Sequence, residues 1–146
     1  MSFQIINRRT VLARGKFAPT GNETTIPVPG SGATVTLFDS TLNGNGLPPI
    51  PGLPFDRIQV NLYSSADSAA NGVVFSSAFD GANAASPSAT NWRQQSTQSF
   101  TNASGPASWD YLMKGSHAKI TYQNSANVLT AWEVEVVGIF DRDPGT

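Results

Sequence analysis

The chain of 146 residues has no cysteine and only one histidine, His117. Without cysteine it cannot form a disulfide framework, a Cys-ligated zinc site or a reactive thiol. One histidine cannot supply several ligands of a catalytic zinc. His117 stands in an alternating stretch with no nucleophile motif nearby, which disfavours a Ser-His-Asp triad. We therefore interpret it as a structural or surface residue on the polar face of a strand.

Charge is also scarce: charged residues make up 13% of the chain, and the formal net charge is −1. These totals give no indication of a nucleic-acid-binding protein. No apolar stretch has the length of a signal peptide or of a membrane-spanning helix. We expect a protein made in a cytoplasm that has no membrane partner.

Helix-favouring residues are few, whereas Ser, Thr, Asn, Gly, Ala and Pro are abundant. Short alternating stretches recur along the chain between polar turns, which is typical of strands rather than helices. The pattern predicts an all-β fold, a single antiparallel two-sheet β-sandwich that is jelly-roll-like. The expected strands include residues 33–38, 57–63, 72–79 and 109–114, with a weaker candidate at 95–100.

The longest alternating pattern runs from His117 to Phe140. Two stretches, 117–123 and 128–137, are joined by the polar residues 124–127, and we expect them to form an antiparallel hairpin. One face of this ribbon is apolar and has to be covered by a second sheet. The apolar face comprises Ile120, Tyr122, Trp132 and Val134.

The N-terminal stretch differs from the rest in charge, because its first 16 residues carry four basic and no acidic side chains: Arg8, Arg9, Arg14 and Lys16. Several prolines and glycines follow. We interpret residues 1–31 as an extended N-terminal arm with an edge strand around Thr10–Phe17, and residues 32–146 as the β-sandwich domain. Two roles stay open for the basic residues: they protect an edge strand from pairing with other chains, or they dock on an acidic partner.

Two further groups are candidates for contact. The Gly/Pro-rich segment 43–54 is apolar for a loop, and we expect it to pack on the body or on a neighbouring subunit through Leu47, Ile50 and Leu53. Trp92 and Trp109 lie in or beside expected loops, where they are either buried at the ends of the sandwich or form a sugar-binding platform.

No catalytic, cofactor-binding or metal-binding residue is predicted. The aspartates mostly occupy turn-like positions, where their side chains bond nearby amides, and Glu133 and Glu135 are explained as one solvated strand face. No loop has the ligand spacing of a calcium site. The glycine clusters are not followed by a helix that could hold phosphate.

Three stretches together resemble a known module: residues 57–72, the turn Phe79-Asp80-Gly81 with Asn91-Trp92, and residues 117–124. Their order and turn residues are similar to those of β-sandwich virion accessory proteins of tailed bacteriophages, of the capsid decoration (cement) or head-fibre type. Residues 82–90 separate the two halves of the Asp-Gly/Asn-Trp turn. The resemblance covers a little over half of the chain and rests on turn signatures.

The resemblance implies a non-enzymatic capsid decoration protein, made in the host cytoplasm, that binds the outer surface of a phage head. Its partners would be the major capsid protein and further copies of itself in a homotrimer. The contacts would come from Arg8, Arg9, Arg14, Lys16, Leu47, Ile50 and Leu53. The alternative is a tail- or fibre-associated module that binds a host glycan or receptor through Trp92 and Trp109.

Overall fold

The computed structural model describes residues 6–17, 26–40, 56–78, 92–113 and 117–142. Within these ranges there are eight strands and one short 3₁₀ helix, η3 (Asn102–Ser104). The strands are β1 (Ile6–Lys16), β2 (Thr34–Asp39), β3 (Arg57–Ser64), β4 (Ser68–Ala78), β5 (Trp92–Gln98), β6 (Ala107–Leu112), β7 (His117–Asn124) and β8 (Trp132–Arg142).

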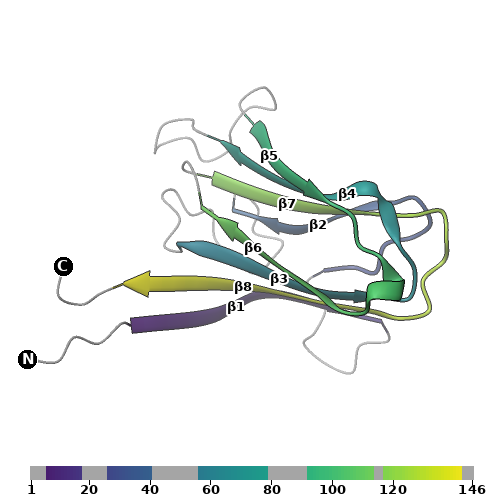
Figure 1. Cartoon of the computed structure of the whole chain (residues 1–146), viewed down its shortest axis with the longest axis horizontal. Helices are drawn as coiled ribbons and strands as arrows, with labels where there is room; N and C mark the ends of the chain where they lie inside the picture. The colour runs from purple at the N-terminus through teal and green to yellow at the C-terminus, as the bar shows by residue number, and fades with distance from the viewer. Residues whose placement is uncertain (1–5, 18–25, 41–55, 79–91, 114–116, 143–146) are drawn as a thin grey trace, which may run out of the picture.

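The strands form two antiparallel sheets of four, packed face to face (Figure 1). Sheet A has the order β1-β8-β3-β6, and sheet B has the order β2-β7-β4-β5. The chain passes from one sheet to the other at every connection except that between β4 and β5. This is the strand order of a jelly roll, and it confirms the predicted all-β sandwich.

The predicted hairpin at the end of the chain is wrong. β7 belongs to sheet B and β8 to sheet A, so residues 125–131 cross the sandwich instead of turning back within one sheet. The crossing is fixed by Ser65, whose Oγ accepts hydrogen bonds from the amides of Thr130 (2.8 Å) and Ala131 (3.1 Å). Leu129 anchors the crossing in the core, since only 4% of it is exposed.

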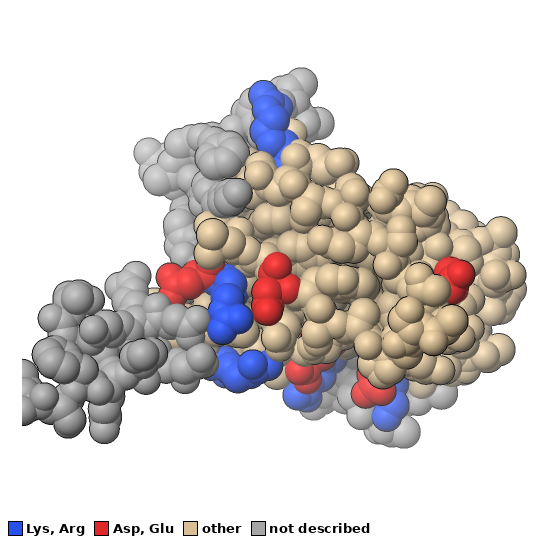
Figure 2. Space-filling view, viewed as in Figure 1, with Lys and Arg blue, Asp and Glu red and all other residues tan. Residues whose placement is uncertain are grey.

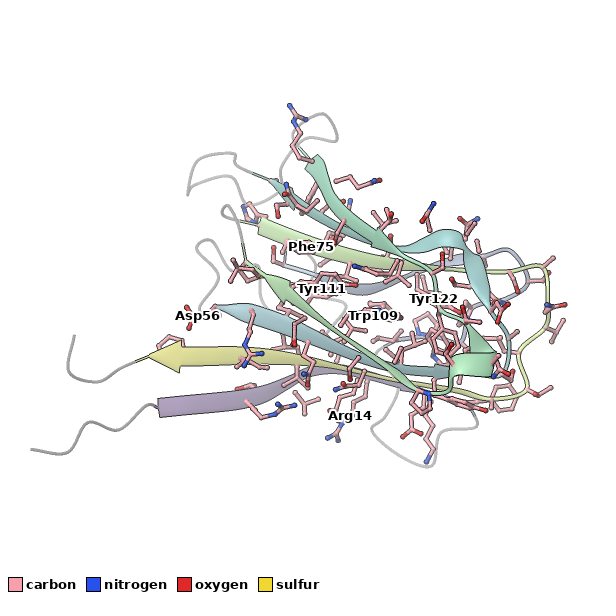
Figure 3. The ribbon with its side chains drawn as sticks, viewed as in Figure 1. Arg14, Asp56, Phe75, Trp109, Tyr111 and Tyr122 are labelled. Carbon is pink, nitrogen blue, oxygen red and sulfur yellow. The ribbon has the colours of Figure 1, made fainter. Side chains whose placement is uncertain are left out.

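The core lies between the sheets, where alternate residues of each strand meet. β3 contributes Ile58, Val60 and Leu62, as its alternation predicts. Two aromatic contacts join the layers: Tyr122 of β7 packs edge-on against Trp132 of β8, and Phe75 of β4 stacks on Tyr111 of β6, each with 4.9 Å between ring centroids. Figure 3 shows Phe75, Tyr111 and Tyr122 between the layers.

β1 is an edge strand of sheet A, longer than the predicted one at Thr10–Phe17. It pairs with β8 from Ile6 opposite Arg142 to Lys16 opposite Glu133, with a β-bulge between Val11 and Ala13. Ile26 lies beside the outer edge of β1, where the Ile26 amide donates a hydrogen bond to the Arg14 carbonyl (3.0 Å). This contact covers part of an edge that would otherwise be open to another chain.

His117 begins β7 and is completely buried, so the structure supports a structural histidine and not a surface one. Its Nδ1 lies 3.4 Å from the Ser40 Oγ, which also accepts the Ala118 amide at 3.1 Å. With both the imidazole and the hydroxyl buried, the described part of the chain offers no open approach to this pair.

Candidate functional site

The charged side chains are distributed unequally over the two sheets. Most of those that the structure describes lie on the outer face of sheet A: Arg9, Arg14, Lys16, Arg57, Asp110, Glu133 and Glu135. The remaining described ones are scattered elsewhere: Asp39, Asp56, Asp67, Arg93 and Lys119. Figure 2 shows this gathering as a band of blue and red side chains over the lower layer.

The strand register explains the band, because residues directly opposite one another project from the same face of a sheet. One row holds Arg9, Ile139, Arg57 and Leu112, and the next holds Val11, Val137, Gln59 and Asp110. A third row holds Arg14, Glu135, Asn61 and Ser108, and the last holds Lys16, Glu133 and Tyr63. The first two rows and the last two rows form different surfaces.

The first two rows make a mixed polar and apolar surface, which we call the docking patch: Arg9, Val11, Arg57, Gln59, Asp110 and Leu112. Hydrogen bonds cross it from β1 to β6, from Arg9 Nη2 to Gln59 Oε1 (2.8 Å) and from Gln59 Nε2 to Asp110 Oδ1 (3.2 Å). Arg57 lies 3.5 Å from Asp110 in an ion pair.

Apolar side chains flank this polar network at both edges of the sheet. Val11 on β1 is 43% exposed, and Leu112 on β6 is 64% exposed. Most exposed apolar side chains occur singly and need no explanation. Here two of them border a hydrogen-bonded network of charged groups, a combination that resembles the mixed composition of protein–protein interfaces.

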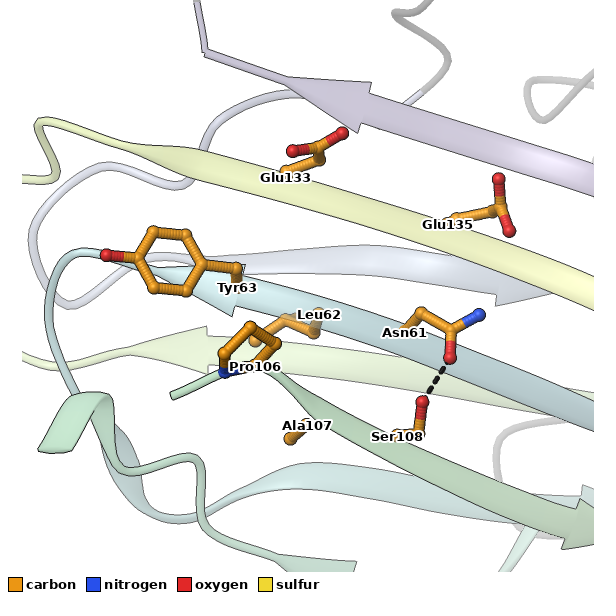
Figure 4. Close-up of a pocket in the computed structure, with 8 residues that line it drawn as sticks. All are labelled: Asn61, Leu62, Tyr63, Pro106, Ala107, Ser108, Glu133 and Glu135. Carbon is orange, nitrogen blue, oxygen red and sulfur yellow. Dashed lines mark hydrogen bonds between the residues drawn. The ribbon is translucent and has the colours of Figure 1, made fainter. Parts of the chain in front are cut away.

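The last two rows surround a hollow of about 410 Å³ on the same face, which we call the Tyr63 trough (Figure 4). Its walls come from three strands, and its side chains offer an aromatic ring, an amide, a hydroxyl and two carboxylates. Those that line it are Asn61, Tyr63, Pro106, Ser108, Glu133 and Glu135. The Ser108 hydroxyl donates a hydrogen bond to Asn61 Oδ1, which orients the amide.

A smaller hollow of about 280 Å³ adjoins the trough on the β1 side and shares Glu133 and Glu135 with it. Arg14 and Lys16 line this second hollow. Arg14 Nε lies 3.4 Å from Glu135 Oε2, with roughly half of the Arg14 side chain exposed, so solvent screens the pair and its contribution to stability is small. Figure 3 shows Arg14 projecting away from the core.

The segment that leads into β6 is held in place beside the trough. Asp67 Oδ1 accepts the Asn102 amide (2.8 Å), and Asn102 Nδ2 donates to the Ser64 carbonyl (2.7 Å), which ties η3 to the end of β3. Gly105 follows with φ 75° and ψ −162°, a conformation essentially restricted to glycine. Pro106 is thereby positioned as a wall of the trough.

The contact residues predicted for a decoration protein divide into two groups. Arg9, Arg14 and Lys16 lie on one strand and on one face, and β1 also includes Arg8. Leu47, Ile50 and Leu53 lie outside the described residues. Arg9 and Arg14 also contact acceptors on their own sheet: Arg9 contacts Gln59, and Arg14 contacts Glu135.

The two tryptophans are not brought together, and both lie in strands instead of loops. Trp109 projects to the inner side of β6 and packs against the core. Trp92 begins β5 in sheet B, and Lys119 Nζ lies 4.4 Å from its ring centroid. Lys119 reaches it across Ser76 and Ala78, the short side chains of β4. A sugar platform made from both rings has no support in this arrangement.

The Tyr63 trough was missed by sequence reasoning, although a signal for it was present. Because Ile58, Val60 and Leu62 point inward, Tyr63 belongs to the outward set of its strand, where an aromatic ring is out of keeping with its polar neighbours. No cluster of His, Asp and Glu in the described residues has the arrangement of a metal site. None of the described helical structure is long and apolar enough to cross a membrane.

No protein-family model, curated protein or solved structure matches this chain significantly.

Proposed function

We propose that this chain is a non-enzymatic virion structural protein of the capsid decoration type, which attaches to the outer surface of a phage head through the docking patch. The virion assignment rests on the resemblance of residues 57–72, 79–92 and 117–124 to phage accessory modules. Jelly rolls occur in many viral coat domains, which is an analogy at the level of the fold and agrees with the proposal.

The observation that carries the attachment site is the combination of exposed apolar and hydrogen-bonded charged side chains in the docking patch. Leu112 and Val11 provide apolar area that a partner would bury. Arg9 and Asp110 offer groups of opposite sign, which set orientation and partner choice more than raw affinity. All of these side chains stand on one sheet, so little order has to be gained on binding.

This proposal changes the role first given to the basic residues. A free arm would reach an acidic capsid surface by itself, whereas β1 presents Arg9 as part of a rigid face. Capsid binding would then depend on Arg9 and Leu112 together. A homotrimer on a symmetry axis would multiply the contact, so that three weak patches give firm attachment.

Co-sedimentation with capsids of its own phage, assembled without this protein, tests the proposal. We expect wild-type protein to pellet with the capsids, and Leu112→Ser and Arg9→Glu to bind at least about tenfold more weakly, as central interface residues do. Val128→Ser is the matched control for the first, because Val128 is 79% exposed on the crossing between β7 and β8. Arg93→Glu is the control for the second, on sheet B.

Wild-type protein that stays in the supernatant would refute the decoration function. Wild-type binding that neither Leu112→Ser nor Arg9→Glu weakens would refute the docking patch as the attachment site. Light scattering of the free protein measures the proposed trimer directly, and a monomer at the concentration used for binding would remove the multivalent part of the proposal.

A further inference from the structure

We propose that the Tyr63 trough is a binding site for a neutral saccharide. The two surfaces adjoin on the same sheet face, since Asn61 Nδ2 of the trough donates to Gln59 Oε1 of the docking patch (3.4 Å). The inference nevertheless does not rest on the docking patch, because it is argued from side chains that the patch does not include. The Arg9 row and the Lys16 row are seven residues apart along β1, which corresponds to roughly 20 Å.

Tyr63 presents an exposed aromatic ring to the trough. Tyr63 is 37% exposed and lines a hollow that has a volume in the range of small-ligand sites. Its direct cross-strand neighbour is Glu133, so the ring and a carboxylate stand side by side on one face. An aromatic face beside an acceptor suits a sugar ring, which has an apolar C–H face and hydroxyls at its rim.

Hydrogen-bonding groups surround the Tyr63 ring. Asn61 and Ser108 carry both donors and acceptors, whereas Glu133 and Glu135 accept from hydroxyls in charge-assisted bonds. Glu133 is exposed, and no ion pair is formed with it by the described residues. Its carboxylate is therefore available to a ligand.

Positive and negative side chains are balanced around the trough. Two carboxylates, Glu133 and Glu135, are flanked on the β1 side by two cations, Arg14 and Lys16. The four charges cancel, so the surface offers many donors and acceptors without a net field that would select an anion or a cation. A neutral polyhydroxylated ligand fits this balance better than a phosphate, an acidic peptide or a basic side chain.

The trough is also preorganised. The hydrogen bonds from Asn102 to Asp67 and Ser64 fix η3, and the Gly105 turn sets Pro106 beside the ring. The floor is the backbone of β3 and β6, which are paired strands. A ligand would find the walls already in place and would pay little ordering entropy.

An array of neutral mono- to tetrasaccharides of hexoses and N-acetylhexosamines tests the inference with the full chain. We expect wild-type protein to bind at least one of these probes. With that saccharide in solution, titrations followed by NMR should show Tyr63→Ala and Glu133→Gln raising Kd by about tenfold or more, through loss of the stacking face and of a charged acceptor. Tyr63→Phe keeps the ring and should change Kd by no more than about threefold.

Trp92→Ala is the matched aromatic control, because Trp92 lies on sheet B. It should bind the saccharide as wild type does. Tyr63→Ala and Glu133→Gln should still pellet with capsids, which separates failure of this site from failure of the docking patch. A blank array with folded wild-type protein, equal binding by Tyr63→Ala, or binding confined to amine-bearing saccharides and polylysine would each overturn the inference.

Discussion

Replacing Gly15 with alanine tests how the edge of sheet A is closed. A Cβ at this position would lie 2.6 Å from the Ile26 carbonyl oxygen, and 3.0 Å from both Ile26 Cβ and Val134 Cγ1. The nearest of these atoms belongs to the backbone and cannot rotate away. Ile26 can retreat only if its amide gives up the 3.0 Å hydrogen bond to the Arg14 carbonyl.

The expected cost follows from these contacts. Forcing an extra methyl group into a packed site costs about 1–3 kcal/mol, and loss of the backbone hydrogen bond adds about 1 kcal/mol. The reduced freedom of alanine in the unfolded chain returns about 0.5–1 kcal/mol. The net loss of unfolding free energy is therefore about 1–3.5 kcal/mol, which lowers Tm by about 3–10 °C in a chain of this size.

Urea unfolding and calorimetry of Gly15→Ala measure this loss, with Gly30→Ala as the control. At Gly30 the nearest atom to an added Cβ is the Ala33 Cβ at 4.0 Å, so that variant should be at least as stable as wild type. Because the obstacle at Gly15 is a carbonyl, the loss should persist in an Ile26→Ala background. A Gly15→Ala protein that melts within about 2 °C of wild type would refute the reasoning.

Two further variants probe other parts of the frame. In Gly105→Ala no atom lies within 4 Å of the added Cβ, so only backbone strain should lower the unfolding free energy, by about 1–3 kcal/mol. Chemical denaturation measures this loss. An unchanged midpoint would contradict the glycine-specific turn. Tyr111→Phe removes the hydrogen bond from the Tyr111 hydroxyl to Gln98 Oε1, which should lower the unfolding free energy by about 1 kcal/mol at neutral pH. Burial raises the pKa of both Tyr111 and Tyr122, so the stability that they contribute is present below about pH 10 and declines above it as the unfolded chain ionises. Urea midpoints at neutral and alkaline pH should therefore fall less steeply for Tyr111→Phe than for wild type, and parallel curves would contradict this.

Alternation in the sequence predicted the strands well and their partners poorly. Arg57–Ser64 and Thr34–Asp39 lie within a residue or two of their predicted positions, because a half-buried strand has period 2 whichever strand it pairs with. The same period cannot distinguish a hairpin from two strands that face each other across a sandwich. His117–Asn124 and the strand that begins at Trp132 are of the second kind.

The chain nevertheless contains a mark of the crossing. Unbroken alternation over 128–137 would place Val128 on the same face as Trp132, which is buried, yet Val128 is 79% exposed and the adjacent Leu129 is buried. The phase of the alternation therefore breaks between the two strands, as expected where a chain leaves one sheet for the other.

The candidate site was predictable only in part. The basic character of β1 was visible in the sequence, but the acceptors that meet Arg9 and Arg14 come from β3 and β8, more than forty residues away. Local patterns do not encode such neighbours. Tyr63 could have been singled out by its outward phase, whereas the wall at Pro106 depends on long-range hydrogen bonds of η3.

The position of β8 has a consequence for how the protein is made. β8 pairs with both β1 and β3, so the centre of sheet A is absent until the last strand has been synthesised. At 5–20 residues per second, β1 leaves the ribosome about 6–25 s before the end of β8. During that interval its apolar residues have no sheet to join, and among the paired strands only β4 and β5 are consecutive. Before β8 emerges, β3 and β6 are the only described strands of sheet A that have a partner available. Sheet A is therefore completed only after β8 emerges, a slow and non-local step.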